Sequence, residues 1–460
     1  MTLLSLADDA VRKALASGAK AAEAFAMTYR TKSVYIEQDV PKVAEDRTEA
    51  GIGLKVAVGK RVAFTSASLE GQKDVGAAVA AAMKAVKMVP EDPDFPGFTS
   101  FRVMGKVEKT HDAKTADSPV EDLVEMALET TAAAKVRKDI AVPKGIFRVQ
   151  DYELRVANSE GAEGSHRGTL VFLYFTAKSG TKTKAGEGII KSLGVSLSQQ
   201  DFQAIGKRLG ARSVENLEAS ALRERIAGTV VMDPLDLGEM LIQTVGSAVN
   251  AEDVRRKRSP WQDKKGKKVA AEGLNIADMP RLPAGLSSCA VDDEGNPTAD
   301  RPLVADGILR DFVHDHYNAA LLGGKGGNAF RRAVATIEGA YARPAQCSIS
   351  NLVVEPGTQS LDEIIGSVQK GVYIEKLAAP EVNPFSGAFA LEVRNAAIIE
   401  KGELKDHVKY ALLVGNMFEG LKNVAATGRE LRPSHGFLTA TGCCYLPPMA
   451  FDGFELVGQK

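Results

Sequence analysis

The sequence predicts an α+β protein: an N-terminal mixed α/β region with a helix-flanked sheet, followed by a strand-rich, curved or barrel-like C-terminal domain. Three observations predict this fold class. Apolar residues recur at helical spacing near the N-terminus, period-two alternation begins near residue 147, and short β-branched segments separated by glycine and proline follow residue 228. The chain has 460 residues, 44% of them hydrophobic, which is enough for two or three domains.

The first predicted domain covers residues 1–105. An amphipathic helix is expected within residues 3–27, because the apolar residues share one helical stripe, and Gly18 either ends this helix or interrupts it. Strands over 33–38 and 51–66, with glycine-bearing turns, indicate an antiparallel meander. A second helix follows and ends at Pro90.

The second predicted domain covers residues 106–222, and the third covers 223–460. In the second, a helix begins after Ser118, a sheet begins at Phe147, and another helix lies around 200–222. In the third, one helix is expected from about Leu235 to Asn250, with Pro234 near its first turn. Short strands are expected over 349–355, 371–377, 388–395, 397–400 and 410–416.

Charge and cysteine usage exclude several classes of protein. Lysine plus arginine (58) nearly balances aspartate plus glutamate (59), so no global field favours nucleic acid or an anionic membrane. No apolar run approaches the ~20 residues of a membrane span, and the charged N-terminus does not resemble a signal peptide. The cysteines have neither disulfide-framework nor metal-ligand spacing, which favours a reducing compartment. We therefore expect a soluble, cytoplasmic protein with neither nucleic acid nor a membrane as partner.

Histidines and cysteines are the first candidates for chemistry. His314 and His316 lie two residues apart, so on a strand they would project from one face and could share a metal ion. The solvent-exposed face of a strand is the favoured alternative. Cys443 and Cys444 are adjacent, so at most one could face a site, and two small buried residues are the favoured interpretation.

Two further segments have possible ligands. The glycine-rich segment 323–332 could cradle a phosphate beside Lys325, but it matches neither common phosphate-binding motif, so a turning loop is favoured. The basic run 255–268 holds eight cationic residues and Trp261, which could grip nucleic acid by charge and stacking. A charged hairpin tip is favoured there.

Several segments together resemble the TldD/PmbA family, also known as the modulator of DNA gyrase family. They are GIGLKVAVGKRVAFTSASL, VMDPLDLGEMLIQTVGSAVNAEDVRRKRSPW, the turn DEGNPT, ADGILRDFVHDHYNAALLG and LVGNMFEGLKNVAATG. Their order and spacing resemble the family over nearly the whole chain. Within it, the sequence is similar to the TldE (PmbA) branch, the non-catalytic partner of the TldD zinc metallopeptidase.

The resemblance implies a specific difference from the catalytic member. TldD is expected to bind zinc through a His-Glu-x-x-x-His helix and a cysteine nearer the C-terminus. In this sequence Ile242, Gln243 and Ser247 stand at the His, Glu and His positions. Isoleucine has no lone pair, glutamine is a poor base and serine a poor zinc ligand, so we expect no metal and no catalytic residue in this chain.

The family also implies the partner and the substrate. A TldE-type subunit pairs with a TldD-type subunit, which carries the zinc, and the heterodimer encloses a chamber for proteolysis of unfolded or extended peptides. Modulation of DNA gyrase has no support in this neutral chain, and we interpret that label as an indirect effect.

Two alternatives remain. One is a stand-alone homodimer that binds peptides or a small ligand without peptidase activity. The other is a displaced catalytic site built from His314, His316, His435 and Cys443. The sequence does not indicate substrate-binding residues or the surface that meets a partner.

Overall fold

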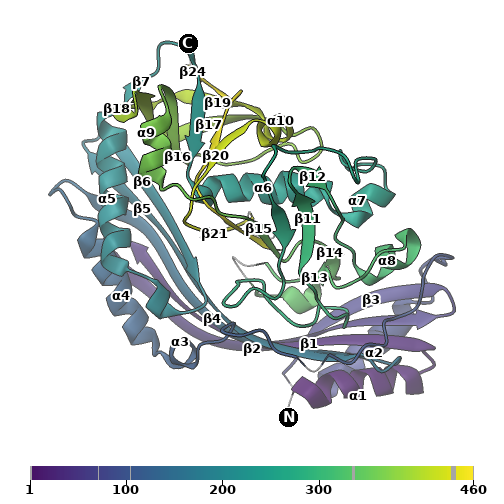
Figure 1. Ribbon diagram of the computed structural model, residues 1–460. Helices are drawn as coiled ribbons and strands as arrows, with labels where there is room; N and C mark the ends of the chain where they lie inside the picture. Colours follow the sequence, from purple (N-terminus) through teal and green to yellow (C-terminus); the bar gives the residue numbers. More distant parts are fainter. Residues whose placement is uncertain (1–2, 71, 104, 334–336, 437–441, 459–460) are drawn as a thin grey trace.

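The computed structural model describes residues 3–70, 72–103, 105–333, 337–436 and 442–458. It confirms the α+β class. A long, curved antiparallel sheet, flanked by helices on its outer face, wraps around one side of a strand-rich C-terminal part (Figure 1). Among the described helices, none is long and apolar enough to cross a lipid bilayer.

The curved sheet contains six strands in the order β3-β2-β1-β4-β5-β6, and every neighbouring pair is antiparallel. The meander expected from the sequence is confirmed by β1, β2 and β3. β1 also pairs with β4 from Glu23–Asn158 to Glu37–Lys144, so segments on both sides of residue 105 form one sheet. The strands are β1 (Ala21–Glu37), β2 (Val40–Val58), β3 (Arg61–Ser68), β4 (Ala141–Asn158), β5 (Glu163–Gly180) and β6 (Ala185–Gly194).

The first helix is shorter than the sequence predicted. α1 spans Leu3–Ala16, and β1 begins at Ala21 after a turn in which Gly18 has a φ of 99°. Of the two roles expected for Gly18, the helix stop is confirmed, and continuation of the helix to residue 27 is wrong. Both faces of β1 are buried: Ala24 faces the helices and Phe25 faces the C-terminal part. A strand buried on both faces loses the alternation that would distinguish it from a helix.

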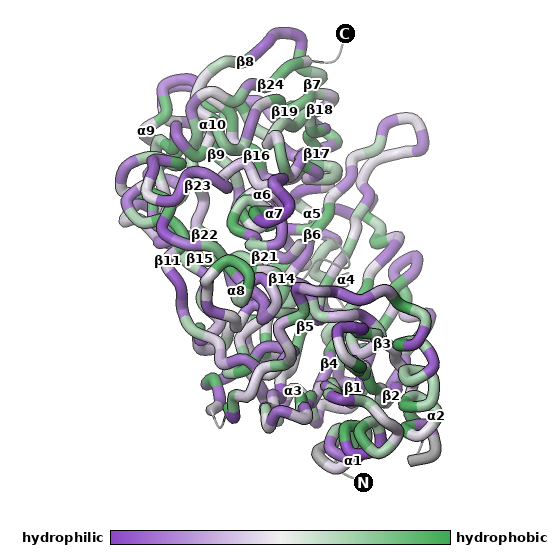
Figure 2. Tube along the Cα trace, turned by 90° about the vertical axis from the view of Figure 1, so that its right-hand side faces the viewer, coloured by the Kyte–Doolittle hydropathy of each residue, from purple (hydrophilic) through white to green (hydrophobic). Residues whose placement is uncertain are grey.

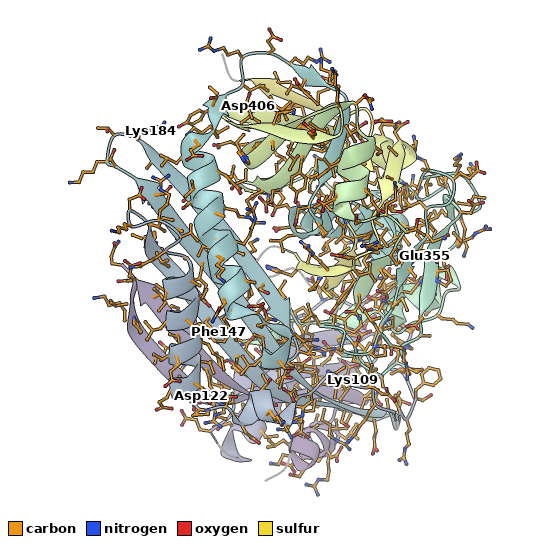
Figure 3. The ribbon with its side chains drawn as sticks, turned by 60° about the vertical axis from the view of Figure 1, so that its left-hand side comes forward. Lys109, Asp122, Phe147, Lys184, Glu355 and Asp406 are labelled. Carbon is orange, nitrogen blue, oxygen red and sulfur yellow. The ribbon has the colours of Figure 1, made fainter. Side chains whose placement is uncertain are left out.

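Helices cover the convex face of the sheet. α1 packs on β1 and α2 on β3, and Figure 2 places both helices beside β1 to β3 near the N-terminus. α4 and α5 pack on each other and over the other end of the sheet, where Phe147 of β4 contacts Phe202 with 5.5 Å between ring centroids (Figure 3). These helices are α2 (Gln72–Ala85), α3 (Ala113–Asp117), α4 (Val120–Ala133) and α5 (Phe202–Glu218).

The C-terminal part is built from two larger sheets around one buried helix, α6 (Pro234–Ala248). The expected helix start is confirmed, because Pro234 occupies the first turn and the Asp233 side chain accepts from the Leu235 N–H. The strands expected over 388–395 and 397–400 form one continuous strand, β17.

The ten-stranded sheet holds β20 (Val424–Thr427), β23 (Met449–Phe451), β9 (Thr229–Met232), β16 (Lys370–Leu377), β17 (Ala388–Glu400), β19 (Ala411–Asn416), β24 (Glu455–Gly458), β8 (Ile226–Ala227), β18 (Glu403–Lys409) and β7 (Ser220–Ala221). The second sheet holds β12 (Ile308–Leu309), β11 (Arg301–Ala305), β10 (Ile276–Asp278), β15 (Asn351–Val354), β22 (Cys443–Leu446) and β21 (Arg432–His435). β13 (Ala329–Phe330) and β14 (Gln346–Cys347) form a separate pair. The remaining helices are α7 (Ala251–Arg255), α8 (His316–Leu322), α9 (Leu361–Ser367) and α10 (Met417–Lys422).

Candidate functional site

A cavity of about 390 Å³ separates the concave face of the curved sheet from the C-terminal part. Its floor is a row of residues directly opposite one another on three strands, Ile146, Tyr174 and Lys191, with Phe172 beside them. These side chains share a face because alternate residues of a strand point the same way. We call this space the concave cavity.

The opposite wall of the concave cavity comes from α6 and the segment after β16. Glu239 projects from α6, while Ala378, Ala379 and Pro380 complete a mostly apolar wall. His435 at the end of β21 adds a further polar group, and the other charged residues of the lining are Arg148, Lys376 and Glu381. A pocket of this size with apolar walls and a few polar groups is the usual form of a small-ligand or side-chain binding site.

Each of the two lysines that line the concave cavity forms an ion pair. Lys376 Nζ lies 2.8 Å from both carboxylate oxygens of Asp236, with both side chains 3% exposed. Lys191 Nζ lies 3.4 Å from Glu239 Oε2, and burial raises the pKa of the Glu239 carboxyl. Sequence reasoning missed these groups. Their signal was two acidic residues three positions apart in an otherwise uncharged helix, Asp236 and Glu239.

His435 is buried and neutral at physiological pH. Its Nδ1 lies 2.5 Å from Gly436 O, which makes Nδ1 the protonated nitrogen, and its ring stands edge-on to Phe172. Burial, followed by the charge of Lys191, lowers the pKa of His435 to about 4. Nε2 is also buried and has no hydrogen-bond partner among the described residues.

A second, polar cavity of about 590 Å³ adjoins the first, and Lys191 lines both. It lies beside β6, the edge strand of the curved sheet. Within it, Arg212 Nη2 lies 2.9 Å from Glu375 Oε1, and Arg208 also pairs with Glu375. Arg432 Nη1 lies 3.4 Å from Asp233 on the opposite wall. We call this space the polar cavity.

The three positions at which a zinc motif is expected do not converge. Ile242 is 7% exposed and belongs to the main apolar core, and Ser247 is half-buried near the end of α6. α6 is an uninterrupted α-helix, so residues 242 and 247 lie ~140° apart around its axis.

Gln243 has a structural role instead. Its Nε2 donates to Pro380 O at 2.7 Å, and its Oε1 accepts from the Val382 N–H at 3.1 Å. Gln243 therefore fixes the segment that forms one wall of the concave cavity. With an aliphatic residue in the core and an amide committed to backbone groups, these side chains do not fit a zinc ion.

His314 and His316 do not lie on one strand, so the expected shared face is wrong. Only Val313 forms an isolated bridge, to Asn250, and His316 is the first residue of α8. Asp315 caps that helix by accepting from the Asn318 N–H, which turns the chain between the two histidines. Because Asp315 starts a helix here, the alternating residues around it do not form a strand.

His435 and Cys443 do meet, as directly opposite residues of β21 and β22. The Cys443 thiol donates to Asn351 Oδ1 at 3.0 Å, and burial raises the pKa of this thiol to about 12. Such a thiol stays protonated and is a poor nucleophile or ligand. In the part of the chain that the structure describes, no three histidine, cysteine or acidic side chains form a possible metal-binding group.

The two other candidate segments have structural roles. Residues 323–328 form the expected loop, with Lys325 exposed. The basic run 255–268 is a sequence of turns rather than the expected hairpin tip, with one bridge from Lys268 to Ile308. Trp261 is 1% exposed and packs against Phe418, so it cannot stack on a nucleic-acid base.

Family models match most of the chain. Residues 22–86 match domain 1 of the PmbA/TldA metallopeptidases, residues 114–217 match their central domain, and residues 226–458 match their C-terminal domain. The chain belongs to the PmbA/TldD family. This family includes proteins named as metalloproteases, and one from Methanothermobacter thermautotrophicus is 30% identical over 292 residues. That match covers 62% of this chain and 62% of the relative, so less than two thirds of the relative is spanned.

Solved structures share the family fold. TldE from Thermococcus kodakarensis superposes with a TM-score of 0.88 at 21% identity, covering 98% of this chain and 100% of that one. A Thermotoga maritima protein named as a candidate modulator of DNA gyrase gives a TM-score of 0.84 at 19% identity, covering 99% and 100%. These likenesses show that this chain has the fold of both solved proteins over nearly its whole length.

Proposed function

We propose that this chain is a non-catalytic, TldE-type subunit of a cytoplasmic peptidase. In this proposal it pairs as a heterodimer with a TldD-type zinc peptidase, and the two chains enclose a chamber for proteolysis of unfolded or extended peptides. The zinc and the catalytic residues belong to the partner. The concave cavity of this subunit contributes part of the chamber wall.

One observation carries the proposal. At the α6 position expected to hold a zinc ligand, Ile242 is buried in the apolar core. At the position expected to hold a general base, Gln243 is hydrogen-bonded to the backbone of residues 380 and 382. A general base must accept a proton from metal-bound water, and an amide whose oxygen and nitrogen both bind backbone groups cannot do so. The names of the relatives support a metallopeptidase context, and the TldE structure supports the branch.

The test compares this chain alone with the chain co-expressed beside a TldD-type protein. Alone, it is expected to contain less than stoichiometric zinc and to cleave no unstructured peptide. With the partner, a complex with zinc in the partner and peptide cleavage is expected. Substituting the partner's zinc ligands supplies the control and should abolish cleavage.

Two outcomes would contradict the proposal. Stoichiometric zinc with peptide turnover by this chain alone would make it a catalyst. A stable homodimer that binds no TldD-type chain would favour the stand-alone binding protein.

A further inference from the structure

The concave and polar cavities together have the form of a binding groove within this chain. They share Lys191, and their walls come from both the curved sheet and the C-terminal part. The surface of the concave cavity is mostly apolar, with charged groups at its margins, and its volume of about 390 Å³ exceeds that of any single side chain. An apolar side chain of a ligand therefore fits there with room for its attached backbone.

Lys191 has hydrogen-bonding capacity left for a ligand. Its side chain is 15% exposed, and its single ion-pair partner among the described residues, Glu239, lies 3.4 Å away. An ammonium group has three donors. Two of them remain for a carbonyl or carboxylate oxygen in the space that the two cavities share.

The edge of β6 offers main-chain groups at the same residue. Before and after Lys191 in the strand, side chains already bind the main-chain groups of this edge. Asn216 accepts from the Glu187 N–H, and Arg212 donates to Ile189 O. Beyond Lys191, Gln200 donates to Leu193 O. By strand alternation, the N–H and C=O of Lys191 point to the same edge. They have no partner among the described residues and adjoin the polar cavity. An extended peptide can pair with such an edge.

Arg432 gives the polar cavity a group that can bind an acidic ligand. Four cationic side chains line the cavity, and each already pairs with a carboxylate: Lys191 with Glu239, Arg208 with Glu215 and Glu375, Arg212 with Glu375, and Arg432 with Asp233 and Glu430. Of the four, Arg432 has the most exposed side chain, at 52%, and its partner Asp233 lies 3.4 Å away. A guanidinium group has five N–H donors, so Arg432 can also bind a carboxylate of a ligand.

We propose that the two cavities bind an extended, acidic polypeptide segment. An aromatic or branched aliphatic side chain enters the concave cavity, the peptide backbone pairs with the Lys191 main chain, and an acidic side chain lies near Arg432. The inference rests on the proposed function for its peptide substrate class, and it assigns substrate binding to the subunit without the zinc motif.

The test is calorimetric titration of the full-length chain alone with an acetylated, amidated octapeptide that carries one phenylalanine followed by two glutamates. Saturable binding is expected. Replacing phenylalanine with alanine, or both glutamates with lysine, is expected to weaken binding roughly tenfold or more. Binding of the acidic peptide should also weaken as salt concentration rises.

Two variants of the chain locate the binding. Ala379→Trp places a large ring into the concave cavity from an exposed position, and Lys191→Met removes the shared ammonium group while keeping the stem. Each is expected to weaken binding roughly tenfold or more. The matched control is Ala132→Trp, at an exposed position of α4 on the convex side, which should bind like the wild type. Thermal unfolding of all three variants checks their folding.

Three results would overturn the proposal: no saturable binding, equal binding of the lysine peptide, or wild-type affinity in a folded Ala379→Trp or Lys191→Met variant. Self-association that depends on these residues, measured by sedimentation, would assign the groove to a second copy of the chain and also overturn it. Because the titration uses this chain alone, a negative result leaves the pairing with a zinc peptidase intact. Conversely, zinc-dependent cleavage by this chain alone would contradict its proposed non-catalytic role, but it would leave the proposal of peptide binding in the two cavities unchanged.

Discussion

Gln243 has a structural role in this chain. At a position where the family resemblance expects a glutamate, the amide donates to one backbone group and accepts from another, which a carboxylate cannot do. The amide therefore attaches α6 to the segment that shapes the concave cavity.

Replacing Gln243 tests this role. Gln243→Ala is expected to lower the free energy of unfolding by roughly 1–3 kcal/mol, because the Val382 N–H and Pro380 O lose their partner. Gln243→Glu should be at least as destabilising at neutral pH, since a carboxylate cannot donate to Pro380 O. Urea unfolding measures both. Gln203→Ala, at an exposed position of α5, is the control and should change stability by less than ~0.5 kcal/mol.

His435 predicts a dependence of stability on pH. Its folded-state pKa of about 4 lies below the unfolded value of ~6.5, so between these values the unfolded chain binds a proton that the folded chain does not. The contribution of His435 is fully favourable above pH ~6.5 and is lost as pH falls toward 4. His435→Asn keeps a donor near the Nδ1 position and removes the titration. From pH 7 to 4, the variant should lose roughly 3 kcal/mol less stability than the wild type. Equal losses in urea unfolding would contradict the assignment.

Among the helices and strands, the packing of α4, α5 and β6 depends on glycine. A Cβ atom at Gly210 of α5 would lie 2.0 Å from Ala134 O, and one at Gly206 would lie 2.3 Å from Thr130 O. On the sheet side, a Cβ at Gly186 of β6 would lie 2.1 Å from Ser213 O. The backbones therefore approach too closely for any side chain, and this closeness places Arg208 and Arg212 over the polar cavity.

Gly210→Ala separates this packing effect from helix propensity. Alanine favours a helix by ~1 kcal/mol over glycine, but here the added methyl group must displace the backbone of Ala134. A net loss of roughly 1–3 kcal/mol in the free energy of unfolding is expected. Gly76→Ala in α2 is the control, because a Cβ there meets nothing within 4 Å, and it should stabilise by ~0.5–1 kcal/mol. Thermal or urea unfolding measures the change in stability of both variants. If both substitutions stabilise the protein, the close packing at Gly210 is contradicted.

In the whole molecule, a buried charge network joins the curved sheet to the C-terminal part. Arg331, 1% exposed, lies 3.5 Å from Glu23 of β1, and Lys55 of β2 lies 2.8 Å from Glu294. The Arg331 guanidinium also lies over the Phe25 ring and donates to Arg343 O. Burial raises the pKa of Glu23 to about 7 even beside these cations. The network therefore fixes how β1 and β2 meet the C-terminal part.

A double-mutant cycle on Glu23 and Arg331 tests this connection. Arg331→Met leaves Glu23 with a weaker set of partners and is expected to cost roughly 3–5 kcal/mol. In Glu23→Gln/Arg331→Met no unpaired carboxylate remains at residue 23, so the double variant should be more stable than the sum of the single losses predicts. Urea unfolding of the four proteins measures this coupling. Additivity within ~0.5 kcal/mol would show that the two residues act independently.

The sequence alone determined the features whose energies are local. The start of α6 at Pro234, the positions of α4 and α5 and the longer strands follow from caps, propensities and patterns within a few positions. The tertiary structure decided the rest: the end of α1, the burial of Trp261, the pairing of β1 with β4 and the meeting of Lys191 with Glu239. These depend on contacts between residues far apart in the chain, whose free energy exists only once the backbone has brought them together.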